Sequence, residues 1–225
     1  MASLKRAPHE KPPGFIAPQL AQQTGTAPTG KGWIHELKFD GYRIQIHLRD
    51  RGRDGKRERN VQLLTCKGLD WSARMPDIAR AAERLNVRSA ILDGEAVALD
   101  DWGLSNFADL QAAFYERRQR YITYFAFDLL YLDGHNLRGL PLVGRKWILE
   151  QLLQAAGNAG PLRFSEGIEA DGQEVFEKAC ALGAEGIVSK RADAPYMPGR
   201  GSAWLKLKCR LEQEFVIGRF TLPSK

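Results

Sequence analysis

Alternation of apolar and polar residues is the clearest pattern in this chain. Between Tyr42 and Leu48 every second residue is apolar, which is the period-two pattern of a half-buried strand. The apolar run at 61–65 is expected to pair with it across the Gly- and Arg-rich segment 49–60. Trp33–Lys38 also suits an extended segment. The other predicted strands lie at residues 90–99, 122–132, 186–190, 204–209 and 215–220.

Helical patterns are interleaved with these strands. Helices are predicted at residues 107–114, from Pro141 onward, and from the capping box at 171–174 to Gly183. The second helix is expected to bury Trp147, Leu149 and Leu153 or their neighbours. Strand pairs with helices inserted between them predict an α+β fold with mainly antiparallel sheets and packed helices. The regular βαβ order of a doubly wound fold is not seen, and neither is a G-x-G-x-x-G or P-loop sequence.

Composition fits one globular domain. The chain has 225 residues, of which 44% are apolar, enough for a sizeable core. Residues 1–14 are rich in proline and charge and are expected to form a flexible tail, and 15–220 to form the folded domain. No apolar run approaches ~20 residues and there is no apolar secretion signal, so we expect no membrane span and a cytoplasmic location.

Net charge and cysteine content say less about the binding partner and the cellular compartment. The formal net charge of +6 permits an anionic partner without requiring one. Cys66, Cys180 and Cys209 are odd in number, far apart and without metal-ligand spacing. They are interpreted as structural residues in a reducing compartment.

Candidate chemistry begins at Lys38, which closes an apolar strand just before Asp40-Gly41. In an extended segment Glu36 and Lys38 share one face. The simplest interpretation is a surface Lys–Glu pair beside a structural Asp-Gly turn. The alternative is a lysine placed for nucleophilic attack, and these residues alone favour the simpler one.

A pair of lysines near the end of the chain makes the alternative stronger. Alternation places Trp204, Lys206 and Lys208 on one side of a strand and Leu205 and Leu207 on the other. Two lysines on one face of a core strand are costly unless water or an anion meets them, and a phosphate would suit them. An edge strand with a hydrated face remains the competing interpretation.

Acidic and aromatic residues complete a possible nucleotide site. Glu95, in Asp93-Gly94-Glu95, and Glu185 offer the hard oxygen ligands that Mg²⁺ prefers, although each alone is more often a turn acid. Phe127 could stack on a base, although a core phenylalanine is commoner. Nearby cations would lower the pKa of Lys38 from ~10.4 and stabilise phosphate charge in a transition state. Together these residues predict attack of Lys38 on a nucleoside triphosphate.

Five motifs in order resemble the covalent nucleotidyltransferase superfamily. They are Glu-x-Lys-x-Asp-Gly-x-Arg, Asp-Gly-Glu, Phe-Asp-Leu-Leu-Tyr-Leu-Asp-Gly, Glu-Gly-Ile-Val-Ser-Lys-Arg and Trp-Leu-Lys-Leu-Lys. Gly68–Trp71 and Ala194–Arg200 resemble the ligase domain of bacterial ATP-dependent DNA ligases of the ligase D type. The resemblance runs from about Phe15 to Phe220 and implies the ATP-grasp-like fold of ligase adenylation domains.

The resemblance implies a role for each candidate residue. Lys38 would attack the ATP α-phosphate and become lysine–AMP; AMP would pass to a DNA 5′-phosphate, and the 3′-hydroxyl would displace it to form the phosphodiester. The nucleotide-binding set would be Glu36 on the adenine amino group, Leu37, Phe127 on the ring, Arg43 and Glu95 at the ribose, and Lys206 and Lys208 on the α-phosphate. Glu185 and Glu95 would hold Mg²⁺ or Mn²⁺.

The sequence departs from the family pattern in two places. Thr65-Cys66-Lys67 stands where the family has Ser-Arg or Thr-Arg, which puts one phosphate contact in doubt. Residues 221–225 are expected to begin an oligonucleotide-binding domain that the chain lacks, so the chain is expected to adenylate slowly and to seal nicks poorly alone.

Three functions therefore stay open at this point. The first is the adenylation domain of a DNA ligase acting on nicked or broken duplex DNA near the nucleoid, with a Ku-type end-binding protein and a polymerase module as possible partners. The second is an RNA ligase or a GTP-using capping enzyme. The third is a catalytically impaired nucleic-acid-binding module.

Overall fold

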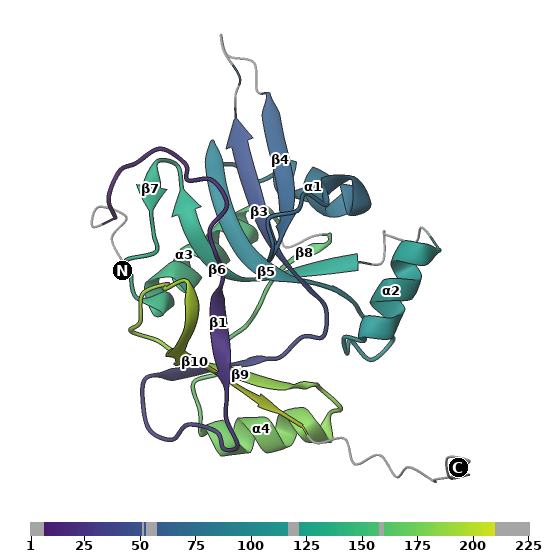
Figure 1. Cartoon of the computed structure of the whole chain (residues 1–225), viewed down its shortest axis with the longest axis vertical. Helices are drawn as coiled ribbons and strands as arrows, with labels where there is room; N and C mark the ends of the chain where they lie inside the picture. The colour runs from purple at the N-terminus through teal and green to yellow at the C-terminus, as the bar shows by residue number, and fades with distance from the viewer. Residues whose placement is uncertain (1–6, 51, 53–57, 117–121, 158–159, 210–225) are drawn as a thin grey trace, which may run out of the picture.

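Two β-sheets form the frame of the molecule in the computed structural model, which describes residues 7–50, 52, 58–116, 122–157 and 160–209. Figure 1 shows the larger sheet in the upper part of the molecule and the smaller sheet below it. Neighbouring strands are antiparallel except for β1 with β10 and β6 with β8. The α+β class with mainly antiparallel sheets is therefore confirmed.

The larger sheet has six strands in the described residues, and most of them were predicted. Its order is β4-β3-β5-β6-β7, with β8 paired to β6. The bounds are β3 (Tyr42–Asp50), β4 (Arg59–Thr65), β5 (Ser89–Ala98), β6 (Ile122–Leu132), β7 (His135–Asn136) and β8 (Leu162–Phe164). The pairing of 61–65 with the Tyr42 strand is as expected. Asp93 and Glu95 lie within β5, a central strand, and not at a strand edge.

The smaller sheet has four strands in the described part of the chain, in the order β1-β10-β9-β2. The bounds are β1 (Gln19–Gln23), β2 (Trp33–Leu37), β9 (Gly186–Arg191) and β10 (Gly199–Lys208). Because β10 lies between β1 and β9, it is an interior strand, and the edge-strand interpretation of Lys206 and Lys208 is wrong. The strand predicted at 215–220 lies outside the described residues.

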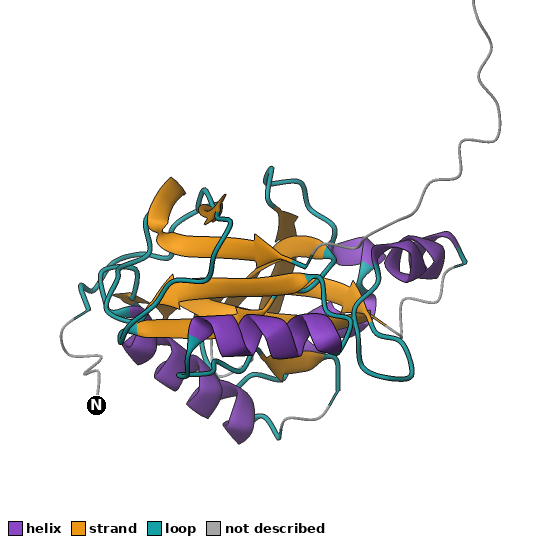
Figure 2. Cartoon of the chain, turned by 90° about the horizontal axis from the view of Figure 1, so that it is seen from below, coloured by secondary structure: helices purple, strands orange, loops and turns teal. Residues whose placement is uncertain are grey.

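Helices cover both sheets. They are α1 (Pro76–Glu83), α2 (Phe107–Tyr115), α3 (Leu142–Ala155) and α4 (Gly172–Ala181), together with a 3₁₀ turn at Ser72–Arg74. The first three contribute to the main core with the larger sheet, and α4 packs on the smaller sheet. In the view from below, α4 lies in front of those strands (Figure 2). No described helix is long and apolar enough to cross a membrane.

The alternation in β3 decides which of its side chains face the core and which face the predicted nucleotide-binding residues. Ile44, Ile46 and Leu48 are at most 1% exposed and lie in the main core with α1, α2 and α3. Because successive side chains point to opposite faces, Arg43 and His47 lie on the other side. That side looks toward the smaller sheet, where Phe127 and Ile91 meet Trp204 of β10 in a second cluster.

Close backbone approach explains two glycines beside the predicted site. A Cβ on Gly41 would collide with the Ala96 carbonyl of β5, so only glycine lets the chain pass from β2 into β3 there. Gly186 has φ +149° and faces the Leu207 carbonyl of β10 just as closely. The Asp40 carboxylate accepts from the Phe107 amide at 3.3 Å, which ties this turn to the start of α2.

Several sequence expectations are corrected. Residues 7–14 are not loose where the structure describes them: Ala7 is buried, and the Pro8 carbonyl accepts from the Asn136 amide at 2.9 Å. Trp147 is 46% exposed; the residues that α3 buries are its neighbours Arg145 and Lys146 as well as Leu149 and Leu153. Helix α1 was not predicted because it has only eight residues and buries only Ile78 and Ala82.

The cysteine interpretation is also wrong in part. Cys180, in α4, and Cys209, just after β10, form a disulfide across 29 residues of sequence. Cys66 is the free cysteine in the described part of the chain and is exposed. Spacing alone could not reveal the pair because its two halves meet only once α4 has packed beside β10.

Buried His47 predicts a pH-dependent stability. Its Nε2 lies 3.2 Å from Gln45 Oε1, and burial, aided by the charge of Arg49, lowers the pKa of His47 from 6.5 to about 4. The unfolded chain therefore takes up a proton at a higher pH than the folded protein does. We expect this group to lower the free energy of unfolding by roughly 2 kcal/mol from pH 7 to pH 4.5.

Urea unfolding at the two pH values measures the effect. His47→Gln, which cannot take up the proton, should remove this part of the pH dependence. The same pH dependence in wild type and in His47→Gln would show that His47 is not the cause.

Candidate nucleotide-binding site

A cavity of about 230 Å³ opens between the two sheets and collects most of the predicted site residues. The predicted residues that line it are Glu36, Leu37, Lys38, Arg43, Glu95, Phe127 and Lys206. They come from β2, β3, β5, β6 and β10, or from the turn after β2, so that only the folded chain brings them together. Lys190, Arg200 and Trp204 line it as well.

Lys38 lies beside a carboxylate that is shared between two lysines. Its Nζ is 2.5 Å from Glu185 Oε2, and Lys208 Nζ is 3.0 Å from Glu185 Oε1. Burial alone would raise the pKa of Glu185, but the hydrogen bonds from Lys38 and Lys208 hold it below its ordinary value. Glu185 and Lys208 do not line the cavity themselves. Glu185 is connected to it by its ion pair with Lys38, which does line the cavity.

The end of the cavity near Lys38 and Lys206 is rich in positive charge. Burial, together with the charges of Lys38, Lys208 and Arg200, lowers the pKa of Lys206. Like charges gathered at one end of the cavity favour the binding of an anion from the solvent. The lysine face expected from alternation in 204–208 is therefore a real feature of the fold.

Arg43 is fixed by the sheet. Its guanidinium makes a bidentate pair with buried Asp93, at 3.1 and 2.7 Å, and donates to the Gln19 carbonyl at 2.6 Å. Burial alone would lower the pKa of Arg43, but Asp93 raises it above its ordinary value. The guanidinium also lies 5.2 Å from the centre of the Phe127 ring. Arg43 therefore lines the cavity with a rigid, permanently charged group.

Glu95 is half-buried next to Arg43. Burial raises its pKa to about 8, an effect that the charges of Arg43 and Lys38 offset only in part and that Asp93 and Glu185 strengthen. A carboxyl group in such surroundings is poorly solvated as an anion. A bound cation would relieve that cost.

Glu36 is held by three hydrogen bonds from side chains distant in the sequence, and these partners were not predicted from the sequence. It is 2% exposed and receives hydrogen bonds from Lys146, Lys190 and Ser165. Burial alone would raise the pKa of Glu36, but the two ammonium groups hold it below its ordinary value. Glu36 is therefore a buried carboxylate kept ionised at the cavity wall.

Phe127 and Trp204 give the cavity an aromatic wall. Their rings meet edge to face with centroids 5.8 Å apart, and Lys190 Nζ lies 4.3 Å from the Phe127 centroid. Burial lowers the pKa of Lys190, partly offset by Glu36. A flat ligand in the cavity would meet an aromatic face and a carboxylate acceptor at the same end.

A divalent cation fits two of these carboxylates. The described residues hold no group of three or more His, Cys, Asp or Glu side chains arranged as a metal site. Mg²⁺, however, takes one or two carboxylates and completes its shell with water and substrate phosphates. The poorly solvated carboxyl of Glu95 and the Glu185 carboxylate beside Lys38 match that donor set.

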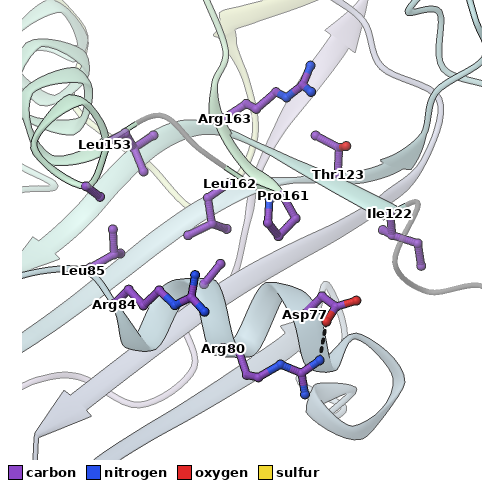
Figure 3. Close-up of a pocket in the computed structure, with 13 residues that line it drawn as sticks. Asp77, Arg80, Arg84, Leu85, Ile122, Thr123, Leu153, Pro161, Leu162 and Arg163 are labelled. Carbon is purple, nitrogen blue, oxygen red and sulfur yellow. Dashed lines mark hydrogen bonds and ion pairs between the residues drawn. The ribbon is translucent and has the colours of Figure 1, made fainter.

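A larger cavity, of about 480 Å³, lies elsewhere and does not contain these residues. Figure 3 shows its walls, with Asp77 and Arg80 from α1, Arg84 just after that helix, Leu153 from α3, and Pro161 and Leu162 at the start of β8. In this view Arg80 pairs with Asp77 on the surface of α1. The exposed turn that holds Cys66 and Lys67 lines neither cavity.

Comparison with known proteins agrees with the geometry. The sequence matches the family described as "ATP dependent DNA ligase domain" over residues 18–208. The chain belongs to this family. As a member of the ATP-dependent DNA ligase domain family, it carries Lys38, Glu95, Glu185 and the Trp204–Lys208 strand all within the matched region.

Proteins of ligase D type are among the relatives of this chain. The chain is 41% identical over 212 residues to the multifunctional non-homologous end joining protein LigD of Pseudomonas aeruginosa, covering 94% of this chain and 24% of that protein. It is 38% identical over 206 residues to LigD of Mycobacterium tuberculosis, covering 90% of this chain and 25% of that protein. This ligase domain thus spans about a quarter of those relatives.

Solved structures agree with this assignment. The ligase domain of M. tuberculosis LigD superposes with a TM-score of 0.71 at 36% identity, covering 86% of this chain and 59% of that one. A mycobacterial DNA ligase D complexed with ATP and MES gives 0.69 at 35% identity, covering 86% of this chain and 60% of that one. The expected covalent nucleotidyltransferase fold is confirmed.

Proposed function

We propose that this chain carries out the adenylation step of an ATP-dependent DNA ligase, with Lys38 as the nucleophile. The observation that carries the proposal is the position of Lys38: it lines the cavity together with Lys206 and Phe127, and its Nζ pairs with Glu185. The Lys38 amine attacks the α-phosphorus of ATP, a phosphoramide bond forms, and the bond to pyrophosphate breaks. The amine attacks in its neutral form, the proton left on Nζ after the P–N bond forms passes to water, and pyrophosphate leaves with the electrons of the broken P–O bond.

The two ends of the cavity orient the nucleotide. Phe127 stacks on the adenine, and Glu36 accepts a hydrogen bond from its amino group. Arg43 and Glu95 lie between the two ends, on the ribose side. Lys206 and Lys208 bind the α-phosphate and stabilise the charge that builds up on its oxygens during attack.

Glu95 and Glu185 would hold Mg²⁺ or Mn²⁺. When bound, the cation neutralises phosphate charge and acts as a Lewis acid on the phosphoryl group. Glu185 also pairs with Lys38 and Lys208, which keeps the two lysines beside each other.

Nicked or broken duplex DNA is the proposed acceptor. AMP passes from Lys38 to a DNA 5′-phosphate, and the 3′-hydroxyl displaces AMP to close the phosphodiester. The relatives' names support end joining in a DNA repair setting. A Ku-type end-binding protein, a polymerase module and a place in the cytoplasm at the nucleoid belong to the same proposal.

Labelled nucleotide tests the proposal. Incubation with Mg²⁺ and α-labelled ATP should leave on wild type a covalent label that survives denaturing gel electrophoresis and alkali, none on Lys38→Ala and none when γ-labelled ATP is used. Labelled GTP should give little product, which separates this function from capping-type transfer. Absence of label on wild type, or equal label on Lys38→Ala, would reject the proposal.

A further inference from the structure

Helix α3 carries two consecutive buried cations that bind different sheets. Arg145, 0% exposed, pairs with Asp128 of β6 in the larger sheet, at 2.7 Å. Lys146, 6% exposed, pairs with Glu36 of β2 in the smaller sheet, at 2.8 Å. One helical turn therefore connects the two walls between which the nucleotide cavity opens.

The bonds of Glu36 leave its carboxylate with a defined free position. Lys146 Nζ donates to Oε1, while Lys190 Nζ and Ser165 Oγ donate to Oε2 at 2.8 and 2.9 Å. A carboxylate offers about four acceptor positions. Three are occupied, and the remaining acceptor belongs to Oε1, the oxygen that Lys146 holds.

Lys146 is itself anchored and does not reach the cavity. Its Nζ also donates to the Ser165 carbonyl at 2.7 Å and lies 4.5 Å from the centre of the Phe164 ring. Glu36, Ser165 and Lys190 line the cavity, whereas Lys146 lies behind them, toward a separate surface hollow with Trp147 and Glu150. Any influence of Lys146 on a ligand therefore passes through Glu36 or through Ser165, which itself donates to Glu36.

We propose that Lys146 is a positioning residue for base selection: by binding Oε1, it fixes the rotamer and the ionised state of Glu36 so that one acceptor faces a purine 6-amino group. The proposal rests on the proposed function. A 6-oxo purine would bring its own acceptor against this carboxylate and leave both unsatisfied, which is a strong basis for rejection.

A structural ion pair alone would predict something different. If Lys146 only held α3 against β2, its loss would lower stability and weaken binding of every triphosphate alike. If it positions Glu36, its loss should matter only for ligands that carry the 6-amino group. Purine riboside triphosphate, which lacks that group, tells these two roles apart.

The experiment compares Lys146→Met with wild type, and with Lys178→Met as a matched control on the surface of α4. Formation of the covalent lysine–nucleotide adduct is followed with ATP and with purine riboside triphosphate. Here kcat is the rate constant of adduct formation at saturating triphosphate, and KM is the triphosphate concentration that gives half of that rate. We expect Lys146→Met to raise KM for ATP about tenfold, with kcat and the KM for purine riboside triphosphate changed by less than about twofold. Lys178→Met should have the same KM and kcat as wild type with both triphosphates.

Other outcomes would contradict the inference. Equal loss with both triphosphates, or a fall in kcat with KM unchanged, would overturn it. Lys146→Gln, which can still donate one hydrogen bond, should recover part of the ATP preference and serves if Lys146→Met does not fold. Binding of both triphosphates is measured by calorimetry in parallel. If wild type forms no lysine–AMP, the proposed function is rejected, but the calorimetric affinities still test the preference for the 6-amino group.

Discussion

Lys38→Arg is expected to abolish formation of lysine–AMP while leaving the fold intact. Arginine keeps the positive charge and can still pair with Glu185, which lies 2.5 Å from the Lys38 ammonium. Its guanidinium stays protonated at any working pH and has no lone pair to attack phosphorus. We therefore expect the rate of adenylation to fall by at least about 10³-fold, with little change in the unfolding temperature.

The comparison with Lys38→Ala separates charge from nucleophilicity. Alanine removes both, and leaves Glu185 with Lys208 as its remaining described partner. Both variants should lose adenylation, but Lys38→Arg should retain more ATP binding. Lys178→Arg on the exposed face of α4 is the control for the substitution itself and should behave as wild type. Measurable adenylation by Lys38→Arg would mean that another group attacks.

Arg145→Met is expected to be the most destabilising single change among the charged residues discussed. Arg145 and Asp128 are both 0% exposed and joined by two hydrogen bonds, at 2.7 and 2.8 Å. Arg145 also donates to the Ala194 carbonyl at 3.2 Å. Methionine fills much of the space but leaves the Asp128 carboxylate buried without its cation, which costs about 3–5 kcal/mol.

Chemical denaturation measures the loss in free energy of unfolding, and a double variant tests whether the unpaired Asp128 charge causes it. Arg145→Met combined with Asp128→Asn removes the isolated charge and should recover part of the lost free energy of unfolding. Lys178→Met, which breaks the exposed pair with Glu174, should cost less than about 0.5 kcal/mol. If Arg145→Met costs no more than that surface change, the buried pair does not support the fold.

The strands and the cation-rich face followed from local patterns. The alternation at 42–48 fixed which side of β3 faces the core, and that at 204–208 placed Lys206 in the cavity and Leu207 against α4. Both are period-two patterns, and a strand converts that period directly into two faces. Glu36 and Lys38 share one face for the same reason.

What the sequence could not give is the set of partners that each residue acquires on folding. Lys146 and Lys190 are 110 and 154 positions from Glu36, and no local spacing relates them. Asp93 belongs to the Asp93-Gly94-Glu95 motif, but its role as the buried partner of Arg43 depends on the pairing of β3 with β5. The disulfide between Cys180 and Cys209 has the same origin in packing.

The position of the adduct tests the central claim most directly. The protein is incubated with ATP and Mg²⁺, its intact mass is measured, and the modified peptide is sequenced by mass spectrometry. We predict the addition of one AMP per chain, attached to Lys38 and absent from Lys38→Arg. An AMP attached to another residue such as Lys206, or no addition although ATP binds, would contradict the assignment of Lys38 as the nucleophile.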